Sequence, residues 1–456
     1  MRKFCLLWGI FIVFGFAGCE TDSVFSENKN PAIVSESQFV SEEQALEHLT
    51  RALAVVDAPG TRTSGKQRTV RSVTRVSSES SAFGTTRSGE TEEAPLAYIV
   101  EFEKGQGSAI LSADNRLDPV VAIYDTYVIT EEDLRLKIEP EAWRTPENLY
   151  CEEDDDYYLG ANNIDFGNRD ILFRETQFIG SYLDTPTGGQ VIRDEAGEWE
   201  LSEGNVLPLL TTQWHQDAPF NNKTPGSYPA GCVAIALAQI MAYHGYPQDY
   251  CDWDLAKQYD TDEYKNGKIT IENEDGTETD IIFDRTPIDN ELADLSLKIG
   301  RGCKIKYDFF GKGESFATPK KAKQFLRDIG YCGTKRHVGY DEGKIIDMLN
   351  KKCPVFIGAL TPECFGHAWV IDGYADYKKT IKRYGGSNLI ETKVQHARLL
   401  HCNWGWGGSR DGYFASKAFD VNKPVTEDDG FVLPATRGEN SKNYTWWFRI
   451  ITYNKP

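Results

Sequence analysis

Three residues far apart in the sequence, Cys232, His367 and Asn403, have the types that a thiol-based reaction needs. A cysteine becomes a strong nucleophile when a neighbouring base takes its proton, and a histidine base needs a third group to hold its ring in one tautomer. His367 begins the apolar run His-Ala-Trp-Val-Ile-Asp, where an imidazole is costly to bury without a partner. Asn403 and Trp404 begin the stretch Asn-Trp-Gly-Trp-Gly-Gly, whose tryptophans can shield a polar pair from water. The order along the chain therefore suits a nucleophile, a base and an orienting amide.

The sequence around Cys232 predicts a buried helix that starts near the thiol. Pro229 and Gly231 interrupt regular structure, residues 233–243 are almost all apolar, and Gly245 begins a stop signal. The first turn of a helix has unpaired N–H groups and the positive end of the macrodipole, and both favour a thiolate. The alternative is an inert cysteine packed in the core, which is the commoner fate of a free cysteine.

A metal site is a weaker interpretation of the other histidines and cysteines. Several of them are close to one another or to His367 in the sequence: Cys364, His396, His401 and Cys402. Their spacing fits no common zinc motif, and cysteines beside aromatic strands are more often packing residues. We therefore expect no metal and no other cofactor.

Length, charge and cysteine usage narrow the class of protein. The chain has 456 residues, which suits two or three domains, and its formal net charge of -19 disfavours a nucleic-acid partner. Of the ten cysteines, Cys5 and Cys19 belong to the N-terminal segment and Cys232 is the candidate nucleophile. The remainder is odd in number and irregularly spaced, so it predicts no disulfide framework.

The N-terminus has the features of an export signal. Two basic residues precede an apolar stretch from 4 to 16, which is too short to span a bilayer comfortably. Cys19 follows Ala-Gly, and this resembles the bacterial lipobox, in which the cysteine is lipidated. We expect a signal peptide at 1–18, a lipid anchor on Cys19 and a polar tether at 19–37, which would hold the protein at the cell envelope. A plain cleaved signal, with Cys19 incidental, is the alternative.

Residues 38–190 are predicted to form a small α+β domain. A capping-box pattern followed by apolar residues at helical spacing predicts a helix over 42–56. The Ser-, Thr- and Arg-rich residues 60–90 have little to bury and are expected to be a flexible loop. Strands are expected at 96–102, 109–111 and 120–124, and a helix near 171–183. A polar, glycine-containing linker is expected at 191–206.

Residues 207–456 are predicted to form a second α+β domain. It opens with the helix of Cys232, and Thr318 with Pro319 forms a cap and first-turn pair for a later helix. Further helices are expected at 291–299 and 319–326, and strands at 354–358, 367–372 and 397–401. Helices first and strands later indicate two segregated layers.

Four segments together resemble the streptopain-type cysteine peptidases of family C10. Three of them are the stretch from Gly-Cys-Val-Ala to His-Gly-Tyr-Pro at 231–247, Gly-His-Ala-Trp-Val-Ile-Asp-Gly at 366–373 and Asn-Trp-Gly-Trp-Gly-Gly at 403–408. The fourth, Trp-His-Gln-Asp-Ala-Pro-Phe-Asn at 214–221, resembles the part of the family that supplies the glutamine of the oxyanion hole, here Gln216. The resemblance covers residues from 207 onward, and residues 96–126 look, more loosely, like the family's propeptide.

The resemblance implies a secreted or surface-anchored zymogen, with a papain-like catalytic domain behind an inhibitory propeptide. Cys232 would attack the peptide carbonyl, and His367 would take the thiol proton and later protonate the leaving amine. Gln216 and the Cys232 backbone N–H would hold the oxyanion. Asn403 would orient His367, and Trp404 lies close to the histidine in this family. The implied partners are protein or peptide substrates, often with an apolar residue two positions before the cut, and the chain's own propeptide.

Two other functions share parts of this pattern. A surface lipoprotein can use a peptidase fold for binding alone, but such a protein is expected to lose a catalytic residue, and here all of them are present. A thiol acyltransferase, such as a transglutaminase, shares the thiol–imidazole pair but lacks the Asn-Trp-Gly-Trp-Gly-Gly element.

Overall fold

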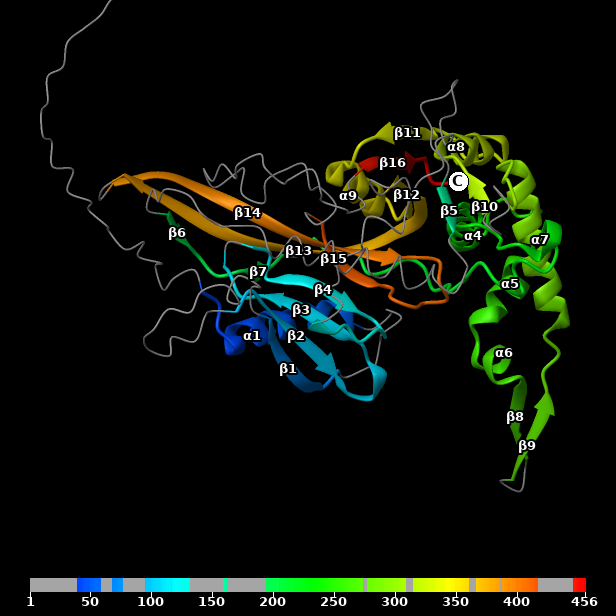
Figure 1. Cartoon of the computed structure of the whole chain (residues 1–456), viewed down its shortest axis with the longest axis horizontal. Helices are drawn as coiled ribbons and strands as arrows, with labels where there is room; N and C mark the ends of the chain where they lie inside the picture. Colours follow the sequence, from blue (N-terminus) through cyan, green and yellow to red (C-terminus); the bar gives the residue numbers. More distant parts are fainter. Residues whose placement is uncertain are drawn as a thin grey trace, which may run out of the picture. The chain divides into compact units, whose positions relative to one another are not determined.

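One antiparallel sheet organises the described part of the chain (Figure 1). The computed structural model describes residues 39–58, 68–76, 95–115, 117–131, 159–161, 194–202, 204–273, 277–308, 315–360, 366–385, 388–416 and 446–456. In spatial order the strands are β1 (Val70–Val76), β2 (Ala97–Phe102), β3 (Ser108–Ser112), β4 (Val120–Tyr124), β15 (Gly412–Ala415), β14 (Asn388–Asn403), β13 (Gly366–Gly385), β12 (Val355–Leu360), β16 (Trp446–Thr452) and β11 (Lys335–Val338). Two small sheets pair β5 (Leu159–Ala161) with β10 (Ser315–Ala317), and β8 (Lys268–Glu272) with β9 (Glu278–Ile282).

Helices fill the spaces between these strands in the sequence, so the expected α+β architecture is confirmed. They are α1 (Glu42–Val56), α4 (Cys232–His244), α5 (Trp253–Lys257), α6 (Asp262–Asn266), α7 (Thr286–Gly302), α8 (Pro319–Asp328) and α9 (Glu342–Asn350). The helices predicted at 291–299 and 319–326 are therefore present as the longer α7 and α8. Within the residues delimited above, no helix is both long and apolar enough to cross a membrane.

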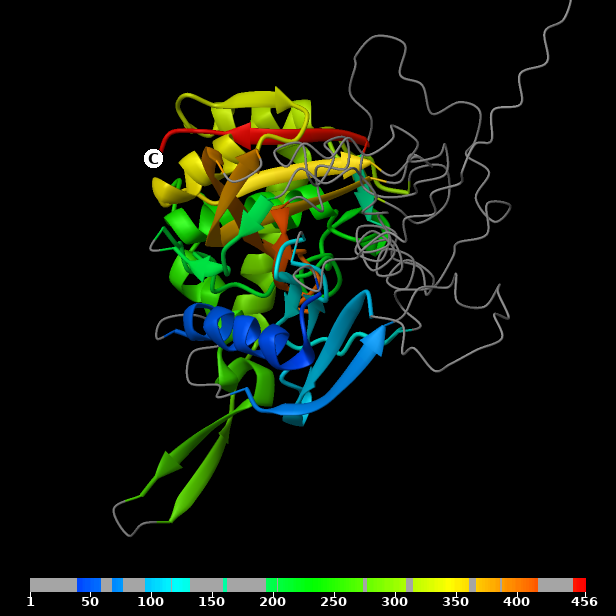
Figure 2. The same ribbon diagram turned by 90° about the vertical axis from the view of Figure 1, so that its left-hand side faces the viewer.

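The N-terminal helix forms as its sequence predicts. The Ser41 side chain accepts the Gln44 N–H, and the Gln44 side chain accepts the Ser41 N–H, which completes a capping box ahead of α1. The buried face of α1 packs against β3 and β4, and Figure 2 shows the helix beside these strands. The strands predicted at 96–102, 109–111 and 120–124 are confirmed as β2, β3 and β4.

The prediction of a flexible loop at 60–90 is wrong for the residues of β1. This strand pairs with β2, with Val73 opposite Val100, and Arg71 forms a 2.7 Å ion pair with Glu101. Both arginines of this strand stay exposed to solvent, which suits a strand at the edge of a sheet. The helix predicted near 171–183 lies outside the described residues.

Strands β4 and β15 join the two halves of the chain in one sheet. Gly412 of β15 is opposite Tyr124 of β4, and the Asp125 N–H donates to the Asp411 carbonyl at 2.9 Å. A Cβ atom on Gly412 would lie 2.2 Å from the Ile123 carbonyl oxygen, so this approach requires glycine. The division into domains 38–190 and 207–456 stays a prediction, because the chain from Gln38 to Pro456 is one compact unit.

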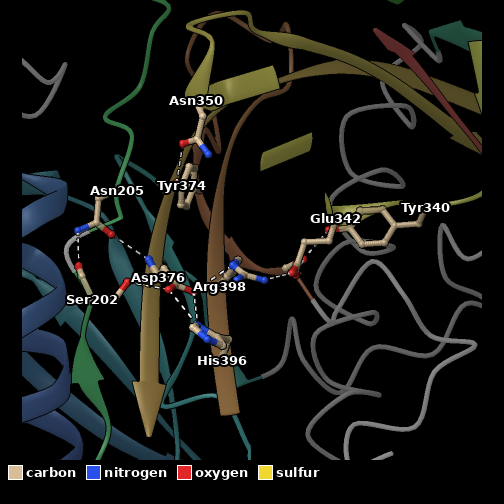
Figure 3. Close-up of polar contacts among 10 residues, drawn as sticks. Ser202, Asn205, Tyr340, Glu342, Asn350, Tyr374, Asp376, His396 and Arg398 are labelled. Carbon is tan, nitrogen blue, oxygen red and sulfur yellow. Dashed lines mark hydrogen bonds and ion pairs between the residues drawn. The ribbon is translucent and has the colours of Figure 1, made fainter. Parts of the chain in front are cut away.

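The segment predicted as a linker at 191–206 is not open where the structure describes it. Strands β6 (Asp194–Ala196) and β7 (Glu200–Leu201) pair with β13. Ser202 donates to the Asp376 carboxylate at 2.6 Å, and the Asp376 N–H donates to the Asn205 side chain at 2.9 Å (Figure 3). The same carboxylate pairs with Arg398 at 3.0 Å, so a polar network holds this segment on the β13–β14 hairpin.

The strands predicted at 367–372 and 397–401 belong to a hairpin that is much longer than its apolar parts. Strand β13 pairs with β14 from Val370 opposite Asn403 to Gly385 opposite Asn388. Cross-strand pairing supplies backbone partners to the polar outer part, where the sequence has no alternation to mark a strand. The strand predicted at 354–358 is confirmed as β12.

Candidate active site

Cys232 is the first residue of α4, and its side chain is buried. The preceding Gly231 has a φ of 95°, a conformation that glycine adopts readily, and no side chain caps the first turn of the helix. Helix α4 packs against β13, and the Ala368 backbone N–H donates toward the Cys232 sulfur. Because Ala368 directly follows His367, the structure brings the thiol to the backbone segment that carries the imidazole.

Burial decides the protonation state of Cys232 in this form of the chain. It raises the pKa of the thiol to about 12, although the backbone N–H groups of Ala368, Val233 and Cys232 itself act in the opposite direction. The expectation that the helix N-terminus favours a thiolate is therefore wrong here, because removal from water outweighs the backbone dipoles. The Cys232 side chain is therefore a neutral thiol at pH 7.

The geometry of His367 defines its tautomer. Its Nε2 lies 3.0 Å from the Trp404 carbonyl oxygen, which can only accept, so Nε2 carries the hydrogen. Burial lowers the pKa of the fully buried imidazole to about 4, and the bond to Trp404 offsets this only in part. The neutral ring therefore presents a lone pair at Nδ1, which has no hydrogen-bond partner within the described residues. This is the nitrogen that can accept a thiol proton.

Aromatic rings enclose the imidazole. The ring centroid of His367 lies 4.7 Å from that of Trp406, with an interplanar angle of 29°, and stacks at longer distances on Trp369 and Trp404. Trp404 and Trp406 stack on each other at 5.7 Å. Stacked indoles exclude water and can stabilise an imidazolium cation when one forms.

Asn403 does not contact His367, which corrects the role predicted for it. Its Nδ2 donates to the Thr212 carbonyl at 2.9 Å and to Gln239 Oε1 at 3.1 Å, while Gln239 Nε2 donates back to Asn403 Oδ1 at 2.9 Å. Asn403 Oδ1 also accepts the Gly405 N–H at 3.1 Å. The amide therefore fixes the backbone on both sides of Trp404, and the Trp404 carbonyl holds the imidazole.

The backbone of Gln216 lies close to the residues that precede Cys232. Its carbonyl accepts the Ala230 N–H at 2.8 Å, two residues before Cys232. The side chain is 3% exposed, and its Oε1 atom has no hydrogen-bond partner among the described residues. A buried amide of this kind can donate its N–H groups to an oxyanion, which is the role that the resemblance implies for Gln216.

The histidines considered as metal ligands bind carboxylates instead. His401 Nδ1 lies 2.5 Å from Asp372, and His401 Nε2 lies 3.5 Å from Asp125. His396 Nδ1 lies 3.1 Å from Asp376 (Figure 3). In the described part of the chain no three His, Cys, Asp or Glu side chains gather into a metal site. Cys364, and the predicted lipid anchor Cys19, lie outside the described residues.

Two residues of the site have no role predicted from the sequence. Gln239 is a fully buried amide that binds Asn403 and the Thr212 hydroxyl, and Asp372 accepts both the Leu210 N–H and His401. Gln239 had a visible signal, since it is the polar exception in an apolar helix. Asp372 directly follows the apolar run of β13, where a buried carboxylate needs a partner.

Comparison with known proteins identifies a family for the part of the chain that contains this site. The model of the Peptidase C10 family matches residues 214–414. Streptopain from Streptococcus pyogenes is 26% identical over 243 residues, which are 48% of this chain and 54% of streptopain, and the streptopain of serotype M1 of that species gives the same values. The chain thus spans about half the length of the curated relatives it matches. The part of the chain that contains Gln216, Cys232, His367 and Asn403 is therefore similar to the cysteine peptidases of the Peptidase C10 family.

Proposed function

We propose that the chain is a cysteine endopeptidase in which Cys232 is the nucleophile and His367 the general base and acid. The observation that carries the proposal is the tautomer of His367, which donates Nε2–H to the Trp404 carbonyl and whose Nδ1 has no hydrogen-bond partner among the described residues. The thiol proton passes to Nδ1 as the sulfur attacks the peptide carbonyl carbon. The imidazolium then protonates the leaving amine, and water hydrolyses the resulting thioester.

The other site residues have supporting roles in this proposal. The Gln216 amide and the Cys232 backbone N–H donate to the oxygen that becomes negative during attack. The Trp404 carbonyl orients the imidazole. Asn403 acts indirectly, because its side chain accepts the Gly405 N–H and so holds the backbone next to Trp404. Substrates are proteins or peptides, with a preference for an apolar side chain two positions before the cut.

The proposal is tested with the purified full-length chain. Wild type should cleave casein, and an epoxysuccinyl inhibitor should label Cys232; Cys232→Ala should lose both properties. Cys332→Ser is the matched control, because Cys332 is a free and exposed cysteine that no step of the proposed reaction uses. Casein cleavage by Cys232→Ala at the wild-type rate would end the proposal.

We also propose that the N-terminal segment keeps the enzyme inactive until it is removed. Two features support this. Strand β4 completes the sheet beside β15, and β5 pairs with β10, whose Ser315 donates to the Pro229 carbonyl at 2.6 Å just before the nucleophile. The buried, protonated thiol is the state expected of an inactive precursor.

Incubation of the purified chain tests this second proposal. Wild type should release a fragment of about 250 residues, the length from 207 to the C-terminus, and activity should rise with its appearance. Cys232→Ala should stay whole if the cleavage is autocatalytic. Arg193, one conceivable cut site, lies outside the described residues. Full activity in the uncleaved chain would contradict the inhibitory role.

Export and lipid anchoring of Cys19 complete the proposal. They are supported by the basic, apolar and small-residue pattern before Cys19. Cleavage would then free the catalytic part from the membrane, since the anchor is on the removed segment. A fatty-acid analogue fed to producing cells should label wild type and not Cys19→Ser; equal labelling would exclude the anchor.

A further inference from the structure

Asp411 is a buried carboxylate that contacts Trp404, the residue whose carbonyl accepts a hydrogen bond from the proposed catalytic imidazole of His367. Its side chain is 0% exposed, and its Oδ1 accepts the Trp404 N–H at 2.9 Å. The residues between Trp404 and Asp411 form a loop with positive φ at Gly405, Gly407 and Gly408. The carboxylate therefore closes this loop at the residue whose carbonyl holds His367.

Trp404 is held from both ends of its backbone. Asp411 accepts its N–H, and His367 donates Nε2–H to its carbonyl at 3.0 Å. The Trp404 ring also stacks on His367, with centroids 6.2 Å apart. A shift of this one residue would move the acceptor and one wall of the imidazole site together. Small displacements of this kind are costly to a reaction that depends on alignment.

The charge of Asp411 adds to this geometric effect. The proposed reaction passes through an imidazolium, and a buried carboxylate nearby favours the protonated form of a base. An amide at the same position can still accept the Trp404 N–H but carries no charge. Geometry and charge can therefore be separated by two variants of one residue.

We propose that Asp411 is a positioning residue for His367, which fixes the Trp404 carbonyl and stabilises the imidazolium through its charge. This proposal rests on the peptidase function proposed above. In this proposal Asp411 acts on His367 through Trp404 and through the charge of its carboxylate, and not on the substrate itself.

The test compares Asp411→Asn and Asp411→Ala with wild type in the full-length chain. We measure kcat and KM against pH after self-processing, and the rate of Cys232 alkylation by iodoacetamide against pH, followed on the Cys232 peptide by mass spectrometry. In Asp411→Asn the alkaline limb of the kcat profile should move down, and the pH at which alkylation rises should move up, each by about 0.5–1 pH unit, while kcat at the optimum stays within a few-fold. In Asp411→Ala, kcat should also fall by about 10- to 100-fold with little change in KM.

Asp260→Asn is the matched control, because the Asp260 carboxylate also accepts from a tryptophan, Trp214 Nε1 at 3.0 Å, but not from the residue that holds His367. The alkaline limb of the kcat profile should stay at the wild-type pH in Asp260→Asn. A uniform loss of activity at every pH in both Asp411 variants, with the limb unmoved, would overturn the proposal in favour of a merely structural role. Should Asp411→Ala fail to fold, the near-isosteric Asp411→Asn still tests the proposal, because its pH profiles either shift or stay in place.

The two proposals can fail separately. If the wild-type chain cleaves no peptide but the alkylation limb moves in Asp411→Asn, the peptidase function fails and the positioning role stands. If wild type cleaves and neither profile moves, the positioning role alone fails.

Discussion

The close approach of β4 to β15 makes a sharp prediction about Gly412. Alanine at this position would place its Cβ 2.2 Å from the Ile123 carbonyl oxygen and 3.0 Å from the Tyr124 Cα. Both are backbone atoms, so no side chain can rotate to make room. Strand β4 must recede or the pairing with β15 must break.

The magnitude follows from the contacts that would be lost. Three residue pairs join the strands, and the Asp125 N–H adds a 2.9 Å bond to Asp411. Losing two to four hydrogen bonds at about 1 kcal/mol each lowers the stability of this junction by about 2–4 kcal/mol. Since 1.4 kcal/mol is tenfold, the population with β4 detached should rise by about 30- to 1,000-fold.

Hydrogen exchange in the full-length Cys232→Ala background measures this population, because self-cleavage cannot interfere there. Amides of residues 120–124 should exchange faster in Gly412→Ala by that factor, while amides of α4 should be unchanged. In the active background, the uncleaved Gly412→Ala chain should show more activity than the uncleaved wild type.

Gly343→Ala is the matched control for the glycine change. This residue is in α9, where the added Cβ would lie 3.4 Å from Asp341 Oδ1, an ordinary contact, and alanine should stabilise the helix slightly. If residues 120–124 exchange at the same rate in Gly412→Ala and in its parent, the glycine does not hold the strands together and the reasoning is refuted.

Three further predictions concern the site. In the uncleaved chain at pH 7, iodoacetamide should modify the exposed Cys332 well before the buried Cys232, whose pKa burial raises to about 12, and equal rates by peptide mass spectrometry would argue against a protonated thiol. Gln239→Leu should lower the free energy of unfolding in urea by about 1–3 kcal/mol, because the Thr212 hydroxyl would lose its bond to Gln239 and the Asn403 amide would lose two of its hydrogen bonds; no change would mean that water replaces the amide. Burial lowers the pKa of His367 from 6.5 to about 4, so the unfolded chain binds a proton that the folded chain does not, and stability should be lost as the pH falls from about 6.5 to 4, by up to about 3 kcal/mol. His367→Gln should lose less stability than wild type over this window in urea titrations at both pH values, and parallel losses would count against the assignment.

Local signals account for the parts of the site that the sequence predicts. The helix of Cys232 is marked by glycines at both ends and an apolar run between them, and both glycines adopt positive φ in the structure. The capping box at Ser41 predicts the start of α1 for the same reason, since its partners are three residues apart. Such features need no knowledge of distant residues.

The missed features depend on contacts between distant segments. Asn403 was expected to hold His367, but its amide is taken by Gln239, a residue 164 positions away. The protonation of Cys232 depends on what covers the sulfur, and this is a property of the folded surroundings and not of the helix alone. Strand β1 becomes a strand because β2 offers it an edge, and its own composition resembles that of a loop.

The placement of β15 next to β4 would have a consequence for the product of the proposed cleavage. If the residues before the cut were removed, β15 would become an edge strand of the sheet, with a row of N–H and C=O groups open to another chain. The strand is only four residues long, from Gly412 to Ala415, and an edge strand this short can form few hydrogen bonds with a strand of another chain. The proposed cleavage would thus expose an edge that favours self-association, and the short length of the strand would limit that association.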